Sequence, residues 1–332
     1  MQVESAMTFP STMVPAVYSE HVRELVVVER TKVADGMVSV VLAAPDGREL
    51  PSWVPGAHVD LLLTPKLVRQ YSLCGSPTNR TGWRIGVLLV AASRGGSRFI
   101  HEELKLGARV AVRGPHNCFP LLAGPAYVFL AGGIGITPLL PMIAEAEAAG
   151  ARWTIFYGGR TRDSMGFVEE LAPYGDRVVI WPEDESGMLD IGLILGQPQT
   201  GVLVYACGPE GLLQAVEGQC ARWPVGSLHV ERFAPRLVDA AAAGRSFEVL
   251  CQQSGVTVTV PADRSILEVV LEAGVPALSS CLEGVCGTCE TAVLEGEPDH
   301  RDSLLSKKET AAGHHMMICV SRSYGPRLVL DL

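Results

Sequence analysis

The sequence predicts a multidomain chain with three folded parts: an antiparallel β-barrel, an α/β domain built on a parallel sheet, and a small α+β domain. Three observations predict it. Short apolar runs separated by Gly, Pro and Asn fill residues 22–120, apolar strands alternate with helical segments from residue 126, and three cysteines crowd residues 279–292. Short strands at this spacing are typical of barrels, and strand–helix alternation is typical of βαβ units. The predicted divisions are a loose tail over 1–18, a barrel over 19–120, the α/β domain over 121–235, a linker over 236–245 and the last domain over 246–332.

Composition narrows the class of protein. The 332 residues carry a formal net charge of −9, which argues against nucleic acid or an anionic membrane as the main partner. Residues 246–332 hold 12 acidic and 6 basic residues, so this part could dock a basic surface or could simply be well solvated. The uncharged stretch 114–144 is interrupted by five prolines and is interpreted as buried, not as membrane-spanning. Nine cysteines and an N-terminus without a basic n-region predict a reducing, cytoplasmic location.

In the first block, two short motifs could contact a phosphate-bearing ligand. The segment "RQYSLCGSP" places Arg69, Tyr71 and Ser72 at a strand end, and "SRGGSRFIHEEL" places two glycines and a serine before a predicted helix. Arginine supplies a cation, and backbone N–H groups before a helix can cradle a phosphate. Each motif alone is equally typical of ordinary structure, because a glycine pair often makes a plain turn and a strand tyrosine often only packs.

The second block opens with a glycine-rich strand-to-helix connection, "AYVFLAGGIGITPLLPMI". It reads G-G-x-G-x-T-P, which differs from the G-x-G-x-x-G fingerprint but could equally bring the backbone close to a pyrophosphate. Gly132, Gly133 and Gly135 form the turn, and Thr137 is expected to cap the following helix. The alternative is a glycine-rich connection without a ligand.

The cysteine loop "SSCLEGVCGTCETA" has the spacing C-x4-C-x2-C through Cys281, Cys286 and Cys289, and the next cysteine is Cys319. Structural disulfides fit poorly with a reducing compartment, and structural zinc usually takes two separated C-x2-C-type pairs. The third interpretation is a plant-type [2Fe–2S] cluster, whose ligand spacing this is. Loop glycines would let backbone N–H groups approach the sulfur atoms. The cluster interpretation is the one favoured.

With these motifs together, residues 246–332 resemble a plant-type ferredoxin module of the β-grasp type. The order of all three blocks resembles the phthalate dioxygenase reductase family, which includes vanillate demethylase reductases. The resemblance implies an FMN site and a pyridine nucleotide site, with NADH favoured over NADPH. The residues so implied are Arg69, Tyr71, Ser72, Gly95, Gly96 and Ser97 for FMN; Gly132, Gly133, Gly135, Thr137, Cys207, Gly208, Pro209 and, as a position common in NADH enzymes, Arg160 for the nucleotide; Phe233 for the flavin ring; and Cys281, Cys286, Cys289 and Cys319 for the cluster.

The activity implied by the resemblance is a relay. NADH reduces FMN, FMN passes electrons singly to the cluster, and the cluster delivers them to a separate terminal oxygenase with a Rieske centre, acting on an aromatic acid or similar compound. No acid–base triad is expected. Two other classes remain open: a redox sensor or electron carrier without committed turnover, and a self-sufficient NADH-dependent reductase or oxidase that reduces oxygen or a quinone directly.

Overall fold

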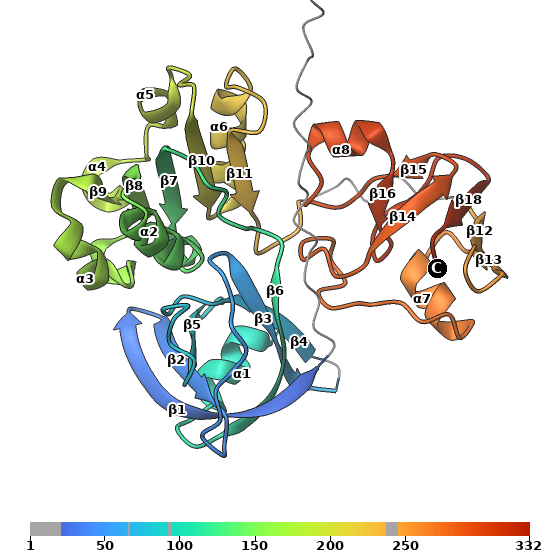
Figure 1. The fold of residues 1–332 in the computed structure, drawn as a ribbon, viewed down its shortest axis with the longest axis horizontal. Coiled ribbons are helices and arrows are strands. Elements are labelled where there is room, and N and C mark those ends of the chain that lie inside the picture. Colours follow the sequence, from blue (N-terminus) through green and yellow to red (C-terminus); the bar gives the residue numbers. More distant parts are fainter. Residues whose placement is uncertain (1–20, 66, 92–94, 237–244) are drawn as a thin grey trace, which may run out of the picture.

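The protein is described by a computed structural model that covers residues 21–65, 67–91, 95–236 and 245–332. The predicted tail over 1–18 lies outside the described residues, as does the predicted linker except for its two end residues. The described residues form three large sheets, one antiparallel, one parallel and one mixed, together with a two-stranded antiparallel sheet, so the predicted fold class is confirmed (Figure 1). None of the helices within the described ranges is long and apolar enough to span a membrane.

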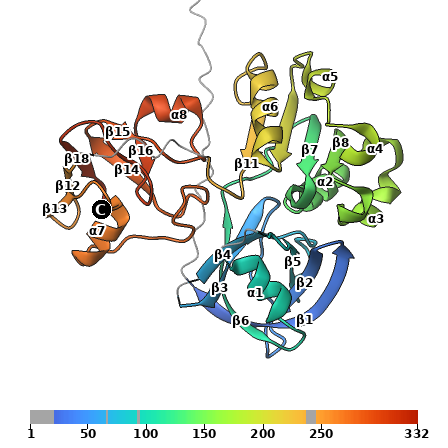
Figure 2. The same cartoon turned by 180° about the vertical axis from the view of Figure 1, so that it is seen from behind.

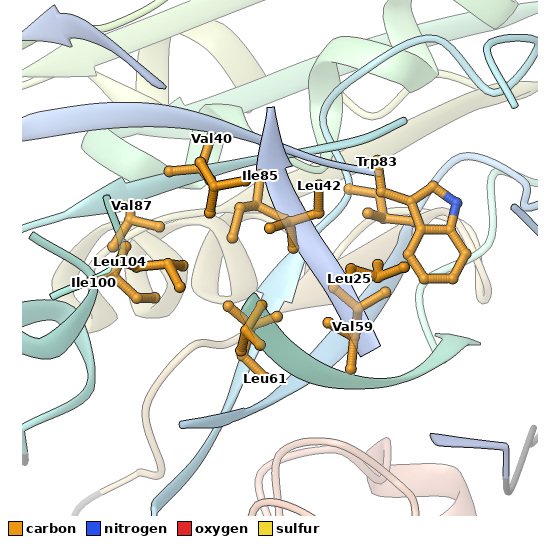
Figure 3. Packing of buried hydrophobic residues seen from close by; sticks show 14 of the residues in the cluster. Leu25, Val40, Leu42, Val59, Leu61, Trp83, Ile85, Val87, Ile100 and Leu104 are labelled. Carbon is orange, nitrogen blue, oxygen red and sulfur yellow. The ribbon is translucent and has the colours of Figure 1, made fainter. Parts of the chain in front are cut away.

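The first sheet is an antiparallel barrel of six strands in the order β4-β3-β6-β1-β2-β5. An antiparallel bridge between Leu73, just after β4, and Ile85 of β5 joins its two ends. Alternate residues point inward, so Val59 and Leu61 of β3 meet Ile100 of helix α1 in the core (Figure 3). The elements are β1 (Val22–Ala34), β2 (Met37–Ala43), β3 (Ala57–Thr64), β4 (Leu67–Ser72), β5 (Trp83–Leu88), α1 (Gly96–Glu102) and β6 (Arg109–Asn117).

The second sheet is fully parallel, in the order β11-β10-β7-β8-β9. From β7 the chain builds β8 and β9 on one side and returns to build β10 and β11 on the other. The strand order therefore reverses between β7 and β10, and ligands of such sheets bind at the carboxyl ends of the strands at this point. The elements are β7 (Ala126–Gly132), α2 (Leu139–Ala148), β8 (Arg152–Gly159), α3 (Val168–Leu171), β9 (Val178–Pro182), α4 (Glu183–Ser186), α5 (Ile191–Leu195), β10 (Val202–Cys207), α6 (Glu210–Cys220) and β11 (Leu228–Glu231).

The third sheet is mixed, in the order β13-β12-β18-β14-β16, with β12 and β18 parallel. Helix α7 begins with a capping box, in which Ser265 and Glu268 each accept a hydrogen bond from the other's backbone N–H. The elements are β12 (Phe247–Cys251), β13 (Val256–Val260), α7 (Ile266–Glu272), β14 (Glu290–Glu295), β15 (Pro298–Asp299), α8 (Lys307–Ala312), β16 (His315–Met317), β17 (Arg322–Ser323) and β18 (Arg327–Leu330).

The three domains are joined in two different ways. Met37 and Cys74 of the barrel belong to the same buried apolar cluster as Phe167 and Ile136 of the α/β domain. The core of the last domain is separate and contains only residues between 247 and 332. Its cysteine loop nevertheless lies beside β4 and β6 of the barrel and makes hydrogen bonds to both strands (Figures 1 and 2).

Candidate functional site

The four cysteines predicted as cluster ligands are all buried and converge at the end of the last domain nearest the barrel. The Cys281 thiol interacts with the thiols of Cys286 and Cys319, and Cys319 interacts in turn with Cys289. All nine cysteines lie within the described residues and none forms a disulfide. In that part of the chain, no group of three or more His, Cys, Asp or Glu residues is arranged to hold a single metal ion. Four converging buried thiols are instead the donor set that a two-iron cluster requires.

The surroundings of these thiols favour the thiolate form at Cys281. Hydrogen bonds from the Cys286 and Cys319 thiols, with smaller ones from the N–H groups of Val285 and Cys286, lower its pKa to about 3 although burial opposes this. The N–H of Glu283 also lies 3.3 Å from the Cys281 sulfur. Backbone donors around the sulfur atoms, which the sequence predicted, are therefore present.

In the barrel, the structure brings the two predicted flavin motifs together. Gly95 lies beside Leu67 and Gly96 beside Arg69, and a Cβ atom on Gly96 would lie 2.5 Å from Cγ of Arg69. A larger residue at Gly96 would therefore displace the Arg69 side chain from the turn. Ser97 accepts a hydrogen bond from the N–H of Val90 at 3.2 Å, which fixes the same turn. Tyr71 is partly buried against the barrel core, and burial raises the pKa of its hydroxyl.

At the parallel sheet, the two predicted nucleotide turns pack directly on each other. Strand β7 ends at Gly132, and a 3-10 turn over Gly133–Ile136 follows. A Cβ atom on Gly135 would lie 2.1 Å from the carbonyl oxygen of Cys207, the last residue of β10. Gly208 and Pro209 follow Cys207 and lie against Gly132. Both turns therefore occupy the point where the strand order reverses.

One expectation about this turn is wrong. Thr137 was expected to cap the helix, but α2 begins at Leu139 with Pro138 in the cap position. The Thr137 hydroxyl donates instead to the carbonyl of Ile134 at 2.9 Å. Its side chain is buried against Gly86 of the barrel, because the 3-10 turn rotates it away from the helix axis and toward the domain boundary.

Sequence reasoning missed Glu231, which lies where three motifs meet. It pairs with Cys207 across β10 and β11, and its carboxylate accepts a hydrogen bond from Ser72 of the barrel at 3.3 Å. The Cys207 sulfur lies 4.0 Å from the same carboxylate oxygen. Burial raises the pKa of Glu231 to about 8, and the Ser72 hydroxyl opposes this only in part. The available signal was a charged residue ending an apolar strand in "HVERFAP".

A cleft at the junction of the three domains gathers these residues. Its lining includes Arg69 and Ser72 from the barrel, Glu231 and Phe233 from the end of the α/β domain, and Cys286 from the cysteine loop. Phe233, predicted to lie near a flavin ring, is 42% exposed and presents an aromatic surface to this region. The cleft offers a cation, a hydroxyl and an aromatic face, which fit the phosphate and ring of a flavin.

Two arginines follow β8 at the rim of the sheet, and they differ in their partners. Arg162 forms an ion pair with Glu185 of α4 at 2.7 Å. Arg160 is exposed, and its carbonyl accepts a hydrogen bond from Asp184. Both side chains are exposed at the carboxyl end of the sheet, and Arg162 is the one held in an ion pair.

Comparisons with known proteins agree with this arrangement. Residues 249–323 match the model of the 2Fe-2S iron-sulfur cluster binding domain. The chain is 42% identical over 316 residues to the vanillate O-demethylase oxidoreductase of Pseudomonas putida, covering 93% of this chain and 99% of that relative. The solved phthalate dioxygenase reductase, described as a modular structure for electron transfer from pyridine nucleotides to [2Fe-2S], matches with a TM-score of 0.69 and 34% identity over 94% of this chain and 98% of that one.

A second solved structure contains a similar chain as part of a larger protein. An intact type IV self-sufficient cytochrome P450 monooxygenase matches all of this chain with a TM-score of 0.86 and 42% identity. The present chain spans 43% of that longer one. The chain belongs to the phthalate dioxygenase reductase family, and it is an oxidoreductase whose cofactors are those that the resemblance implied: FMN, NADH as electron donor, and a [2Fe–2S] cluster.

Proposed function

We propose that this protein is the reductase component of a two-protein oxygenase system and that it supplies a separate terminal oxygenase with single electrons from NADH. One observation carries the proposal: residues predicted for the flavin and a residue predicted for the cluster line the same cleft, Arg69, Ser72 and Phe233 with Cys286. A flavin bound there would accept a hydride from the nucleotide and release electrons one at a time. The chain's own residues bind and orient the cofactors.

We assign the flavin phosphate to Arg69 and the Gly95–Ser97 turn, and the flavin ring to the side of the cleft that Phe233 and Ser72 form. The nicotinamide is assigned to the two packed turns at the ends of β7 and β10, beside Cys207. The role of Glu231 is to hold a proton at its carboxylate close to both rings. Its pKa of about 8 supports this assignment at neutral pH. The cluster is assigned to Cys281, Cys286, Cys289 and Cys319.

For the electron donor, we propose a preference for NADH over NADPH. The acidic residues of α4 follow the strand next to Arg160, and carboxylates there repel a 2′-phosphate. Arg162 is already paired with Glu185 and contributes less positive potential. The nine unbridged cysteines accord with work in a reducing cytoplasm.

For the electron acceptor, we propose a terminal oxygenase with a Rieske centre that acts on an aromatic acid or a similar compound. The support comes from relatives, such as the vanillate O-demethylase oxidoreductase, whose names connect them to such compounds. An acidic module of 12 carboxylates against 6 basic residues would favour a partner with a basic docking face.

The test is an anaerobic titration of the purified holoprotein with NADH and, separately, with NADPH, followed by absorption. We expect flavin bands and an iron–sulfur shoulder, both bleached by NADH at lower concentration than by NADPH. Bleaching of the flavin bands alone in a protein that contains two irons would contradict the relay. Steady consumption of NADH with oxygen or a quinone, unchanged by any oxygenase, would favour the self-sufficient reductase instead.

A second acceptor is favoured by one observation. The match to the P450 monooxygenase covers the whole chain at a TM-score of 0.86, higher than the 0.69 found for the phthalate dioxygenase reductase. A haem monooxygenase encoded separately could therefore take the place of the Rieske oxygenase. NADH-driven reduction of each acceptor class by the purified reductase separates the two, and the productive partner is the one whose reduction rate saturates with acceptor concentration.

A further inference from the structure

A buried carboxylate on the outside of the barrel has no place in the relay described so far. Val59 and Leu61 of β3 point into the barrel core, where both are fully buried (Figure 3). Side chains alternate along a strand, so Asp60 between them belongs to the outer face. An outward carboxylate on a barrel is ordinarily solvated, yet Asp60 is 0% exposed. Another part of the chain must cover it.

Asp60 is the centre of a row of three residues across neighbouring strands. The register pairs Gln70 of β4 with Asp60, and the same position of β3 with Arg113 of β6. The Gln70 amide donates to Oδ1 of Asp60 at 3.0 Å, and Nε of Arg113 donates to Oδ2 at 2.9 Å. Because a buried carboxylate is costly unless it is paired and hydrogen-bonded, this row accounts for how the barrel tolerates Asp60.

Both ends of the row also reach the cysteine loop. The terminal nitrogen of Arg113 donates to the carbonyl of Ser279 at 2.9 Å, and the Gln70 amide donates to the Ser280 hydroxyl. These two serines immediately precede Cys281 in the sequence. The loop that covers Asp60 is therefore the one that carries the cluster cysteines.

A further contact holds the loop beyond Cys281. The thiol of Cys118, which follows β6, donates to the carbonyl of Cys286 at 3.0 Å. Cys118 and Cys286 both line the cleft assigned to the flavin. The barrel therefore makes hydrogen bonds to the loop on both sides of Cys281, next to that cleft.

We propose that Gln70, Asp60 and Arg113 form a docking latch, which holds the cluster loop against the flavin barrel so that electrons can pass between the two centres. The inference rests on the proposed function for the identity of those centres, and it names the latch residues as positioning residues. Gln70, Arg113 and His116, which surround the Asp60 carboxylate, all belong to the barrel, whereas the loop contributes only a backbone carbonyl and a hydroxyl to the latch. The loop can therefore leave without separating an ion pair, and the latch is reversible.

The sharpest variant is Arg113→Lys. Lysine keeps a positive charge for the buried Asp60, which protects the fold, but a single ammonium lacks the planar fork that reaches both Asp60 and Ser279. Ser280→Ala tests the latch from the loop side and leaves the barrel untouched. The matched control is Arg109→Lys, on the same strand β6, because Arg109 pairs with exposed Glu24 at the barrel surface.

Two measurements on the holoprotein decide the matter. Stopped-flow absorption with NADH follows the flavin and cluster bands separately, and small-angle scattering of the oxidised protein measures its radius of gyration. We expect Arg113→Lys to slow cluster reduction about fivefold, since one hydrogen bond of the latch is lost, and to leave flavin reduction unchanged. The radius of gyration should increase in Arg113→Lys, to a smaller extent in Ser280→Ala, and not in Arg109→Lys.

The proposal is overturned if Arg113→Lys and Ser280→Ala both keep the native rate of cluster reduction and the native radius of gyration, or if flavin and cluster reduction slow in parallel. If NADH fails to reduce the cluster of the native protein, the proposed function fails instead. Scattering then still tests the latch by itself, because compaction of the oxidised chain does not depend on turnover.

Discussion

The barrel makes two interfaces, and their chemistry differs. Against the α/β domain it buries Met37 and Cys74 in a shared apolar cluster with Phe167, and Gly86 lies under the Phe167 ring. Against the last domain it makes hydrogen bonds, from Gln70 and Arg113 to the cysteine loop. Extensive apolar burial fixes two domains as one unit, whereas polar contacts of modest strength permit separation.

This difference between the two interfaces matches two different requirements of electron transfer. Hydride transfer needs the nicotinamide and flavin sites held in one geometry, and the shared core supplies it. Delivery of electrons to another protein requires the cluster to be presented to a second surface, and an independent core with a polar contact allows this.

Removing a proposed cluster ligand should abolish the cluster and leave flavin reduction intact. In Cys319→Ser we expect loss of the iron–sulfur absorption and of two irons per chain, while NADH still bleaches the flavin bands, because the barrel and α/β domain have their own core. The matched control is Cys251→Ala, a buried cysteine of the same domain outside the loop. Its cluster content should stay native. Retention of two irons in Cys319→Ser would contradict the assigned ligand set.

Weakening the apolar interface should affect stability most. Phe167 is 4% exposed, and the Arg84 guanidinium lies 5.3 Å from its ring centre. Phe167→Ala should lower the free energy of unfolding of the barrel and α/β unit by about 3–5 kcal/mol, as lost burial and a cavity combine. Denaturant unfolding followed by flavin fluorescence measures it. Val225→Ala, at a residue 92% exposed, is the control and should change stability by less than about 0.5 kcal/mol. A similar loss in both variants would show that the interface is not a shared core.

The carboxylate between the domains predicts a pH dependence. Burial raises the pKa of Glu231 to about 8 from an ordinary value of 4.5. The folded chain therefore keeps a proton that the unfolded chain releases, so this group makes folding less favourable as pH rises from 4.5 to 8. Above pH 8 the negative charge on Glu231 opposes hydride transfer to the neighbouring flavin. The rate of flavin reduction by NADH should therefore fall as pH rises through 8.

Glu231→Gln removes this titration, since the amide stays neutral. The rate of flavin reduction in Glu231→Gln should not decline near pH 8. A modest change in its rate at pH 7 would not count against the prediction. Stopped-flow profiles from pH 6 to pH 9.5 compare the two proteins, with Glu183→Gln, at the exposed N-terminus of α4, as the control. A decline of the same size in Glu231→Gln would assign the pH dependence to another group.

Features with a local signature could be predicted from the sequence. The strands of the barrel and of the parallel sheet follow from apolar runs. The cysteine spacing predicted the converging thiols because three of the four cysteines lie on one loop. The turns at Gly132 and Cys207 were identified separately, and the parallel order of β7 and β10 brings them together. Such features depend on few long-range contacts.

Asp60 and Glu231 could not be predicted in the same way. Each is one charged residue in an apolar strand, and its burial arises from another domain that covers it. Strand alternation correctly assigns Asp60 to the outer face, but no periodicity indicates that the cysteine loop lies on that face. Thr137 was misassigned for a related reason: a threonine before a proline is typical of a helix cap, and the 3-10 turn that displaces it depends on the packing of Gly135 against Cys207.

The smallest expected effect lies away from both interfaces. Arg160 is exposed at the rim of the rigid unit, where it can contact a bound nucleotide without supporting either domain contact. Arg160→Ala should raise the KM for NADH about threefold and leave kcat unchanged, because an exposed cation contributes roughly 0.5–1 kcal/mol of binding. Steady-state kinetics with ferricyanide, which accepts electrons from the flavin, isolates this step. Arg162→Ala is the matched control, since Arg162 is held by Glu185. An equal rise in KM in both variants would show that NADH binding responds to the positive potential of this rim and not to a contact with Arg160. A fall in kcat in Arg160→Ala would show that Arg160 helps to hold the geometry that the apolar interface maintains.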